Sequence, residues 1–270
     1  MLRIRSMAAM ALVSVVTLGS GVATRATGDE PPGHDGRVTH QTLLETTEMD
    51  CYEIAITRAG STAIDAHVPD RYTLLRLTNG APRLVINDYA CAEVSVDGQR
   101  LNKATIVTLG RAVITARDGT PAAGSYLLWL ATDNPGLAAR YRQVGVPASY
   151  VPMSSWSTTT STSGLVSTTI EVVDADLGHT LESSAPVAPV PVPVDPPNGP
   201  IVFYEGSKGS VRMTIVNTEL GSAGARVWGD LSVVPAIAPL VNPQFATMVG
   251  TNFPAGAVRG SWTSTVERID

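Results

Sequence analysis

Residues Val68–Gly98, VPDRYTLLRLTNGAPRLVINDYACAEVSVDG, carry the strongest secondary-structure signal in the chain. Two apolar runs flank the dipeptide Asn79-Gly80, and this pattern predicts two strands joined by a tight turn. The second run continues to Asp97-Gly98, which marks the next turn. We therefore expect a β-hairpin that leads into further antiparallel strand.

Short apolar runs separated by turn residues continue on both sides of this stretch. The chain has 270 residues, of which 44% are hydrophobic, so it can bury a full core as one large β domain or two small ones. Residues 103–116 predict a strand with a bulge at Gly110, and Asp118-Gly119 predicts a turn. Further strands are expected at 125–131, 201–205, 210–218, 225–234 and 260–269, with a turn at 221–224.

One α-helix is expected, at about residues 135–144. Asp133 or Asn134 can cap its start, Pro135 suits its first turn, and Gly145 can end it. One face should pack on the sheet, and it carries Leu137, Tyr141 and Val144. The sequence therefore predicts a mainly β fold, an antiparallel β-sandwich or cone-shaped barrel with this single helix.

Three segments are open to more than one interpretation. Residues 41–55 are ambiguous and could start as a short helix that becomes a strand at Cys51–Ile56. Ser/Thr-rich residues 154–169 form either an exposed strand and loop or a sheet face with hydroxyls outward. The Pro-rich segment 185–200 must be extended, as a linker between domains or as a rigid connection across one domain. We favour the connection, because the last 70 residues are too few for a sandwich, and so expect one β-rich domain over 41–270.

The N-terminus has the pattern of a secretory signal peptide. Arg3 and Arg5 precede an apolar run at 7–19, and small residues follow it. We expect a signal peptide at 1–26, a flexible mature N-terminus at 27–40, and a secreted protein without stable membrane insertion after cleavage.

The two cysteines fit an exported protein. Oxidation is permitted outside the cytoplasm, so a Cys51–Cys91 disulfide is expected, with buried free thiols as the alternative. Closing a loop of about 40 residues stabilises by roughly 3–4 kcal/mol in the chain-entropy model.

Charge and motifs exclude several function classes. The net charge of −5 argues against a nucleic-acid partner. No G-x-S-x-G, H-E-x-x-H, C-x-x-C, phosphate loop or dinucleotide fingerprint occurs, and we expect no metal and no cofactor. The acidic residues Glu171, Asp174 and Asp176 lack the ligand pattern of a calcium loop.

Three aromatic residues on predicted strands are candidates for lining an internal pocket: Tyr89, Trp129 and Trp228. For the two tryptophans, packing in the core is the first interpretation and lining a cavity is the second.

The opening stretch, together with ARVWGDLSVVP from Ala225 and the Ala-Pro-Leu from Ala238, resembles the acetoacetate decarboxylase-like proteins. The resemblance covers about two-thirds of the mature chain by order of elements and implies a β-sandwich or cone-shaped barrel. It also implies a Schiff-base lysine after the central helix, but residues 145–150 read GVPASY and contain no amine. Lys103 and Lys208 are the only lysines, and Lys208 is the remaining catalytic candidate.

We therefore expect an exported protein that binds a small, largely apolar molecule inside the sandwich or barrel without catalysis. One alternative is a decarboxylase-like lyase acting on a keto acid on the same scaffold. Another is an extracellular or envelope interaction module without a pocket, which the Ser/Thr-rich and Pro-rich segments suggest.

Overall fold

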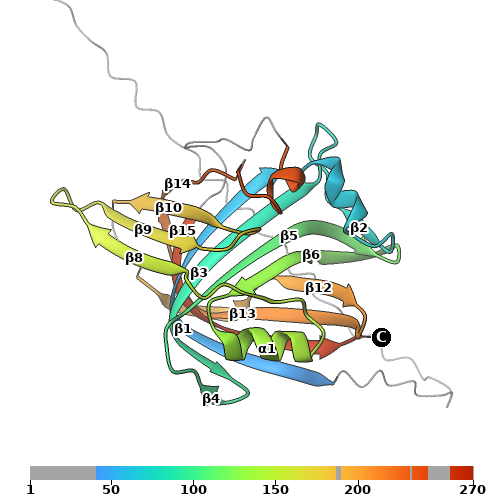
Figure 1. Cartoon of the computed structure of the whole chain (residues 1–270), viewed down its shortest axis with the longest axis horizontal. Coiled ribbons are helices and arrows are strands. Elements are labelled where there is room, and N and C mark those ends of the chain that lie inside the picture. The colour runs from blue at the N-terminus through green and yellow to red at the C-terminus, as the bar shows by residue number, and fades with distance from the viewer. Residues whose placement is uncertain (1–40, 187–189, 232, 243–255, 270) are drawn as a thin grey trace, which may run out of the picture. The chain divides into compact units, whose positions relative to one another are not determined.

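Strands dominate the computed structural model, which describes residues 41–186, 190–231, 233–242 and 256–269 (Figure 1). These residues belong to one compact unit, Val38–Asp270. The predicted signal peptide and flexible N-terminus lie outside the described residues. The elements are β1 (Thr42–Ala59), η1 (Thr62–Ala66), β2 (Tyr72–Leu74), β3 (Arg83–Val96), β4 (Gln99–Arg100), β5 (Thr105–Arg117), β6 (Thr120–Thr132), α1 (Pro135–Gln143), β7 (Ser149–Tyr150), β8 (Ser155–Thr160), β9 (Val166–Val172), β10 (His179–Ala185), β11 (Val192–Asn198), β12 (Ile201–Gly206), β13 (Gly209–Gly224), β14 (Arg226–Trp228), η2 (Ala238–Leu240) and β15 (Gly256–Arg268).

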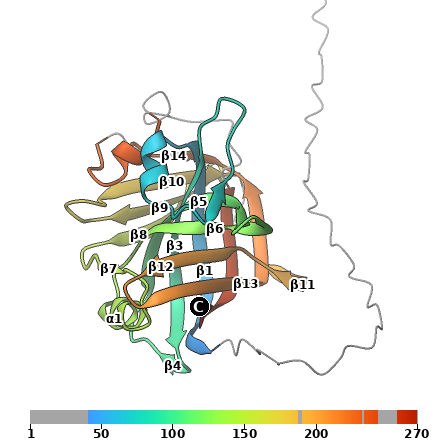
Figure 2. The same cartoon turned by 90° about the vertical axis from the view of Figure 1, so that its right-hand side faces the viewer.

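Seven strands close into a mixed barrel. Their order is β5-β3-β1-β15-β13-β12-β6, and β6 pairs back to β5. All neighbours are antiparallel except β12 and β6, which pair in parallel where Val202 faces Ser125 (Figure 2). The predicted mainly β barrel with one α-helix is confirmed for the described residues, with this parallel contact as a correction to a purely antiparallel sheet.

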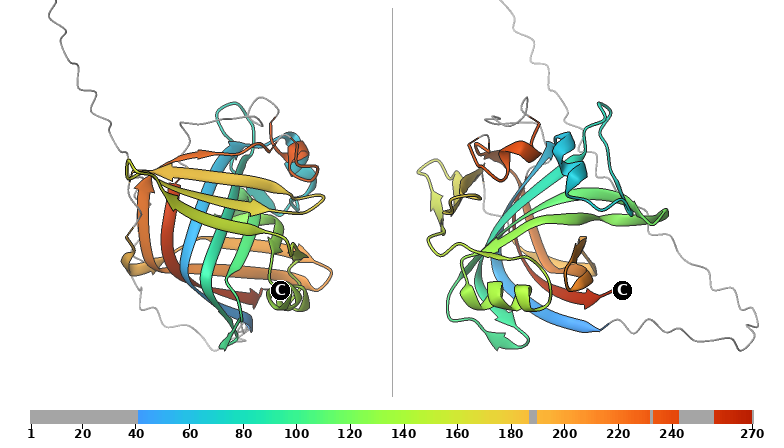
Figure 3. Two further views of the ribbon diagram at one scale, coloured as in Figure 1. Left: turned by 60° about the vertical axis from the view of Figure 1, so that its left-hand side comes forward. Right: turned by 45° about the vertical axis from the view of Figure 1, so that its right-hand side comes forward.

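A second sheet, in the order β14-β10-β9-β8, covers part of the barrel. In Figure 3 its yellow strands cross the blue and teal strands of the barrel. Ile54 and Ile86 on the outer face of the barrel share one apolar cluster with Ile170 and Leu181 of this sheet. Of the two interpretations of the Ser/Thr-rich segment, the sheet face with outward hydroxyls is the one observed. β8 and β9 expose hydroxyl side chains to the outside, and β9 buries Ile170 on the inside.

Two hairpins end in the turns that the sequence predicts. Asp97 and Gly98 have φ values of 49° and 76°, and Asp118 and Gly119 have 50° and 75°. Two consecutive positive φ angles define the type I′ turn, whose twist matches that of paired strands. These turns join β3 to β4 and β5 to β6.

The helix α1 forms as predicted. The Asn134 side chain accepts hydrogen bonds from the N–H groups of Gly136 and Leu137, and Gly145 follows the helix with φ 98°. Leu137, Tyr141 and Val144 are buried in the cluster that fills the barrel interior. The helix thus contributes its apolar face to the core.

The hairpin at Asn79-Gly80 is much shorter than expected. The Arg83 N–H donates to the Leu75 carbonyl at 2.9 Å, but β2 pairs with β5 and not with β3. The reason is that β3 already pairs with β1 on one edge and with β5 on the other, so neither edge is open to β2.

Three further expectations are corrected. Residues 42–59 form one continuous strand with no helix at its start. The expected turn at 221–224 is part of β13, and Gly221 instead allows the backbone of Val190 to approach, since a Cβ there would lie 2.5 Å from the Val190 carbonyl oxygen. The strand expected at 225–234 spans only Arg226–Trp228.

The part of the Pro-rich segment at Val192–Asn198 forms the extended strand β11. This strand pairs with β13 through Val192 and Leu220, with a register irregularity before Asn198. The described residues contain no helix long and apolar enough to cross a membrane.

Candidate functional site

A cavity of about 250 Å³ lies inside the barrel. Polar and apolar side chains share its wall, and they come from five strands and the segment before β12. The lining residues are Glu53, Asn87, Tyr89, Leu109, Arg111, Pro200, Ile215, Asn217, Leu220, Val258 and Trp262. This volume lies just below the usual range of roughly 300–1,000 Å³ for small-molecule pockets, so it suits a small ligand.

A bulge in β1 brings two glutamates to the interior side. Leu44 and Glu48 are buried in even positions, but after Asp50 the interior positions are odd, with Cys51 and Glu53. The pairing of β1 with β15 shifts by one residue between Glu48 and Cys51, and Asp50 has a positive φ of 50°. An added residue in a strand reverses which side chains face inward.

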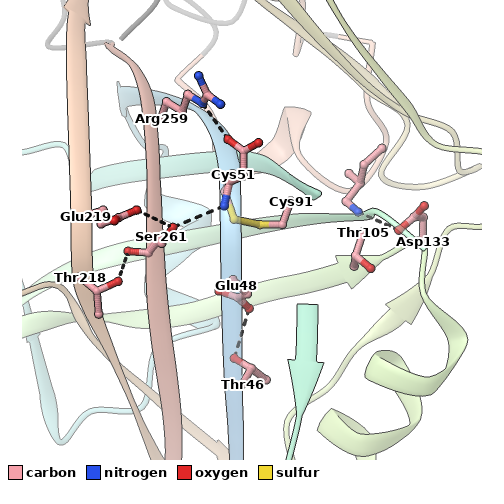
Figure 4. The surroundings of a disulfide bond; sticks show 12 residues. Thr46, Glu48, Cys51, Cys91, Thr105, Asp133, Thr218, Glu219, Arg259 and Ser261 are labelled. Atoms are coloured by element: carbon pink, nitrogen blue, oxygen red, sulfur yellow. Dashed lines mark hydrogen bonds and ion pairs between the residues drawn. A yellow bond between two sulfur atoms is a disulfide. The ribbon is translucent and has the colours of Figure 1, made fainter. Parts of the chain in front are cut away.

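A disulfide links the two strands directly beyond this bulge. Cys51 of β1 faces Cys91 of β3, and their sulfur atoms are bonded at 2.04 Å (Figure 4). The expected pairing of the two cysteines is therefore present. Both residues are buried, so the bond forms part of the core.

A hydrogen-bonded row crosses three neighbouring strands at the cavity wall. Arg111 of β5 donates from Nη2 to Asn87 Oδ1, and Asn87 of β3 donates from Nδ2 to Glu53 Oε1 of β1. Burial raises the pKa of Glu53, and the charge of Arg111 and the bond from Asn87 oppose that rise. The amide thus connects a guanidinium and a carboxylate that form no direct ion pair.

Arg111 keeps most of its donors unused. The residue is 9% exposed, and its Nε is buried without a hydrogen-bond partner in the described part of the chain. The bond to Asn87 uses one of the five N–H donors of the guanidinium. Burial lowers the pKa of Arg111, while Glu53 and Tyr89 counter that effect. A buried guanidinium at a cavity wall with free donors is suited to an oxygen-bearing ligand group.

Glu48 lies behind the cavity wall. It is 1% exposed, accepts a hydrogen bond from the Thr46 hydroxyl at 3.2 Å, and has no partner for Oε2 among the described residues (Figure 4). Burial raises its pKa to about 7, and the nearby donors of Thr46 and Trp262 oppose that rise. Trp262 lines the cavity, whereas Glu48 is not among the lining residues.

Tyr89 lines the cavity and is close enough to both Glu48 and Glu53 for their charges to affect its pKa. Its ring meets Trp262 edge-on with centroids 5.5 Å apart. Burial first, and then the charges of Glu48, Tyr141 and Glu53, raise the pKa of its hydroxyl well above the usual value, so the hydroxyl remains protonated. A protonated phenol at the cavity can donate a hydrogen bond to a ligand.

The three aromatic candidates lie apart from one another. Tyr89 lines the cavity. Trp129 lies on the outer face of the barrel, and its indole packs against Gly110, which has no side chain to block it. The register of β5 and β6 shifts at the same place, between Gly110 and Arg111. Trp228 is half-buried in β14, opposite Glu182 of the second sheet. The two tryptophans therefore do not border this cavity.

Both lysines are engaged away from the cavity. The Nζ of Lys208 donates to the carbonyls of Arg142 and Gln143 at 3.0 and 3.1 Å, at the C-terminal end of α1. A cation there satisfies helix carbonyls and complements the helix dipole. Lys103 pairs with Asp133 at 2.9 Å. Lys208 is therefore not placed to form a Schiff base with a ligand in the barrel.

The polar residues of the cavity carry a weak sequence signal. Arg111 is the only charged residue between Thr105 and Ala116, within a strand that is otherwise apolar, small or hydroxylated. A lone charge in a strand buried on both faces indicates a special environment. Glu53 gave no such signal, because its inward direction depends on the bulge at Asp50.

A second buried polar pair lies on the other face of β3. Asp88 Oδ2 and His179 Nε2 are 2.9 Å apart, and both side chains are fully buried. His179 Nδ1 lies 2.6 Å from the Leu177 carbonyl oxygen. Burial lowers the pKa of His179, but the charge and hydrogen bond of Asp88 outweigh it, so the pKa is raised. The pair joins the second sheet to the barrel.

No protein-family model matches the sequence, and no curated protein matches it. Solved structures do match. Acetoacetate decarboxylase from Legionella pneumophila subsp. pneumophila str. Philadelphia 1 gives a TM-score of 0.54 at 10% identity, over 90% of this chain and 92% of that chain. A second acetoacetate decarboxylase structure gives 0.50 at 12% identity, over 83% and 87%. An acetoacetate decarboxylase-like enzyme from Sphingomonas wittichii RW1 gives 0.49 at 10% identity, over 84% and 91%.

At such low identity the likeness concerns the fold. The predicted resemblance to acetoacetate decarboxylase-like proteins is confirmed at this level. Function has to be argued from the side chains of this chain.

Proposed function

We propose that the barrel cavity binds a small organic molecule with an apolar body and one oxygen-bearing end, such as a short-chain carboxylate or carbonyl compound. The observation that carries this proposal is Arg111, a buried guanidinium with unused donors at the wall of a 250 Å³ cavity. Burying such a group without partners is unfavourable, and a ligand oxygen would supply the missing acceptors.

The apolar part of the cavity wall suits an apolar body in the rest of the ligand. Leu109, Ile215 and Trp262 line the cavity together with the polar row. This refines the expected, largely apolar ligand, because one end of it has to meet Arg111. Lysine-dependent chemistry receives no support, since Lys103 and Lys208 are held by Asp133 and by the end of α1.

The proposed place of action is outside the cytoplasm. The signal-peptide pattern and the buried Cys51–Cys91 disulfide support it, because structural disulfides persist in oxidising compartments. Fractionation of the producing cells, with the mature N-terminus determined by mass spectrometry, tests this directly. Full-length protein retained in the cytoplasm would contradict it.

Ligand identity is best approached by native mass spectrometry of protein purified from its own secretome. A retained mass that is lost on denaturation would identify the bound chemical class. Protein that always emerges unliganded directs the test to added probes.

The added probes are hexanoate and its uncharged analogue hexan-1-ol, with binding measured by calorimetry. Losing a hydrogen bond to a charged group is worth about 1.5–3 kcal/mol, so Arg111→Met should weaken hexanoate binding roughly 10- to 150-fold. The matched control is Arg117→Met, which lies on the same strand β5 and stacks over Tyr72 away from the cavity. Equal affinities in wild type and both variants, or no binding of either probe, would overturn the proposal.

A further inference from the structure

We infer that this cavity is a lysine-independent enolisation site, in which Glu53 removes and returns a proton at the carbon beside a carbonyl group. The inference rests on the ligand site proposed above and assigns a reaction to it. The substrate class is a small ketone or 1,3-dicarbonyl compound with an apolar body.

Glu53 has the geometry of a positioned base. Its Oε1 is held by Asn87, while Oε2 accepts no hydrogen bond from the described residues. Its side chain lines the cavity, so the unoccupied oxygen is the one available to a ligand. Burial makes this carboxylate more basic than an exposed glutamate, which is how enzymes adapt carboxylates to proton transfer near neutral pH.

Two side chains at the cavity can donate hydrogen bonds to the oxygen of an enolate. Arg111 is connected to Glu53 through Asn87 in the same hydrogen-bonded row, and it has unused N–H groups. The hydroxyl of Tyr89, which also lines the cavity, is protonated and can donate a hydrogen bond. Fixed donors aimed at developing negative charge are the usual means of stabilising an oxyanion, and they act most strongly where water is excluded.

The proton transfer balances without any further reactant. The Glu53 carboxylate takes the α-proton, and the C–H electron pair becomes the carbon–carbon double bond. The carbonyl π pair moves to oxygen, where Arg111 and Tyr89 donate hydrogen bonds. Return of the proton from Glu53 to carbon regenerates a ketone and the carboxylate, and solvent deuterium can enter at this point.

Apolar residues form most of the rest of the cavity wall. Leu109, Ile215 and Val258 are apolar, Asn217 and Trp262 contribute an amide and an indole N–H, and Glu53 and Arg111 are the only charged ones among the described residues that line the cavity. Arg111 is buried, and a charge there interacts more strongly with an enolate than it would in bulk water. The mostly apolar part of the wall thus suits the substrate body, and the row of Glu53, Asn87 and Arg111 suits the reacting carbonyl.

The test is deuterium exchange of pentane-2,4-dione and 4-oxopentanoate in D₂O, followed by proton NMR, with binding measured on the same samples by saturation transfer. Positioned general bases contribute about 10²- to 10⁴-fold to rate. We expect wild type to accelerate loss of the α-proton signal above the buffer rate, and Glu53→Gln to lower that enzymatic rate at least 100-fold while binding remains. Glutamine keeps the acceptor oxygen for Asn87, so the fold is conserved.

Three controls separate the possible outcomes. Glu45→Gln changes an exposed glutamate on the same strand and should exchange like wild type. Lys103→Met with Lys208→Met should also retain exchange, which an enamine route through either lysine would not. Glu53→Asp, which withdraws the carboxylate by one methylene, should exchange at an intermediate rate.

The outcomes for the two proposals are distinct. Binding by wild type without exchange above buffer overturns the enolisation site and leaves the ligand site standing. Exchange that survives in Glu53→Gln, or is lost in the lysine variant, also overturns it. Absence of both binding and exchange for these two probes overturns both proposals for carbonyl ligands.

Discussion

Glu48 and Glu53 lie five positions apart on β1, and both carboxylates nevertheless lie on the interior side of the barrel. Side chains of a regular strand alternate, so residues at an odd separation should point to opposite faces. The bulge at Asp50, with φ 50°, reverses the alternation between them. The same strand thus supplies a glutamate to the cavity and a second one behind its wall.

Glu48 should make the protein less stable as pH rises. Its pKa is about 7 in the folded chain and 4.5 when unfolded, so the folded state binds more protons between these values. The free energy of unfolding should therefore fall from about pH 4.5 to pH 7. This difference in pKa corresponds to roughly 3 kcal/mol of unfolding free energy at full deprotonation.

Glu48→Gln should remove most of that dependence. We expect similar unfolding free energies for variant and wild type at pH 4.5, and a variant more stable by about 1–3 kcal/mol at pH 8, after allowing for altered hydrogen bonds. Urea unfolding at the two pH values measures this, with the exposed Glu45→Gln as control. If the unfolding free energies of wild type and Glu48→Gln change with pH in parallel, Glu48 is not the source of the pH dependence.

The sequence predicted those features that neighbouring residues determine. The helix 135–143 follows from the Asn134 cap and Gly145, and the turns at Asp97-Gly98 and Asp118-Gly119 follow from dipeptides that accept positive φ. The disulfide followed from two cysteines in a chain with a predicted signal peptide. Each depends on local chemistry or on a single possible pairing.

The cavity could not be predicted in the same way. Glu53, Asn87 and Arg111 come from three strands, and only their pairing in the barrel places them in one row. The inward direction of Glu53 depends on one added residue at Asp50, which hydrophobic periodicity does not detect. The Asn79-Gly80 hairpin was overestimated for a related reason, since strand partners are decided by long-range pairing.

The His179–Asp88 pair should hold the second sheet onto the barrel. His179→Ala leaves Asp88 buried without its partner, so we expect a loss of about 3–5 kcal/mol in the free energy of unfolding. Replacing both residues, as in Asp88→Leu with His179→Leu, should recover most of that loss. A double variant no more stable than His179→Ala would contradict a specific pair.

The same pair has a pH signature of its own. Because the pKa of His179 is raised in the folded chain, its stabilisation is complete below the unfolded value near 6.5 and is lost as pH rises through the folded value. Histidine NMR in wild type should show one ring that titrates above 6.5. Glu48 acts in the same direction, so the Glu48→Gln background isolates the contribution of His179.

Removing the disulfide should destabilise the barrel without unfolding it at room temperature. The bond closes a loop over 40 residues of sequence separation, for which the chain-entropy model gives about 4 kcal/mol. Cys51→Ala with Cys91→Ala should show that loss in urea unfolding under oxidising conditions. Reduced wild type should match the double variant, because β1 and β3 remain paired in both.

Gly110 should be intolerant of even one methyl group. A Cβ at this position would lie 2.1 Å from the ring of Trp129, closer than any real contact. Overpacking of this kind typically costs 1–3 kcal/mol, so Gly110→Ala should lower the melting temperature by several degrees.

The partner substitution tests the cause of that loss. Trp129→Leu makes room for the added methyl group, so the effect of Gly110→Ala should shrink in the Trp129→Leu background. As a matched control, Gly119→Ala meets no atom within 4 Å and should lose stability only through its positive φ, whichever residue occupies 129. If Gly110→Ala is equally destabilising in both backgrounds, the contact with Trp129 is not the reason for the glycine.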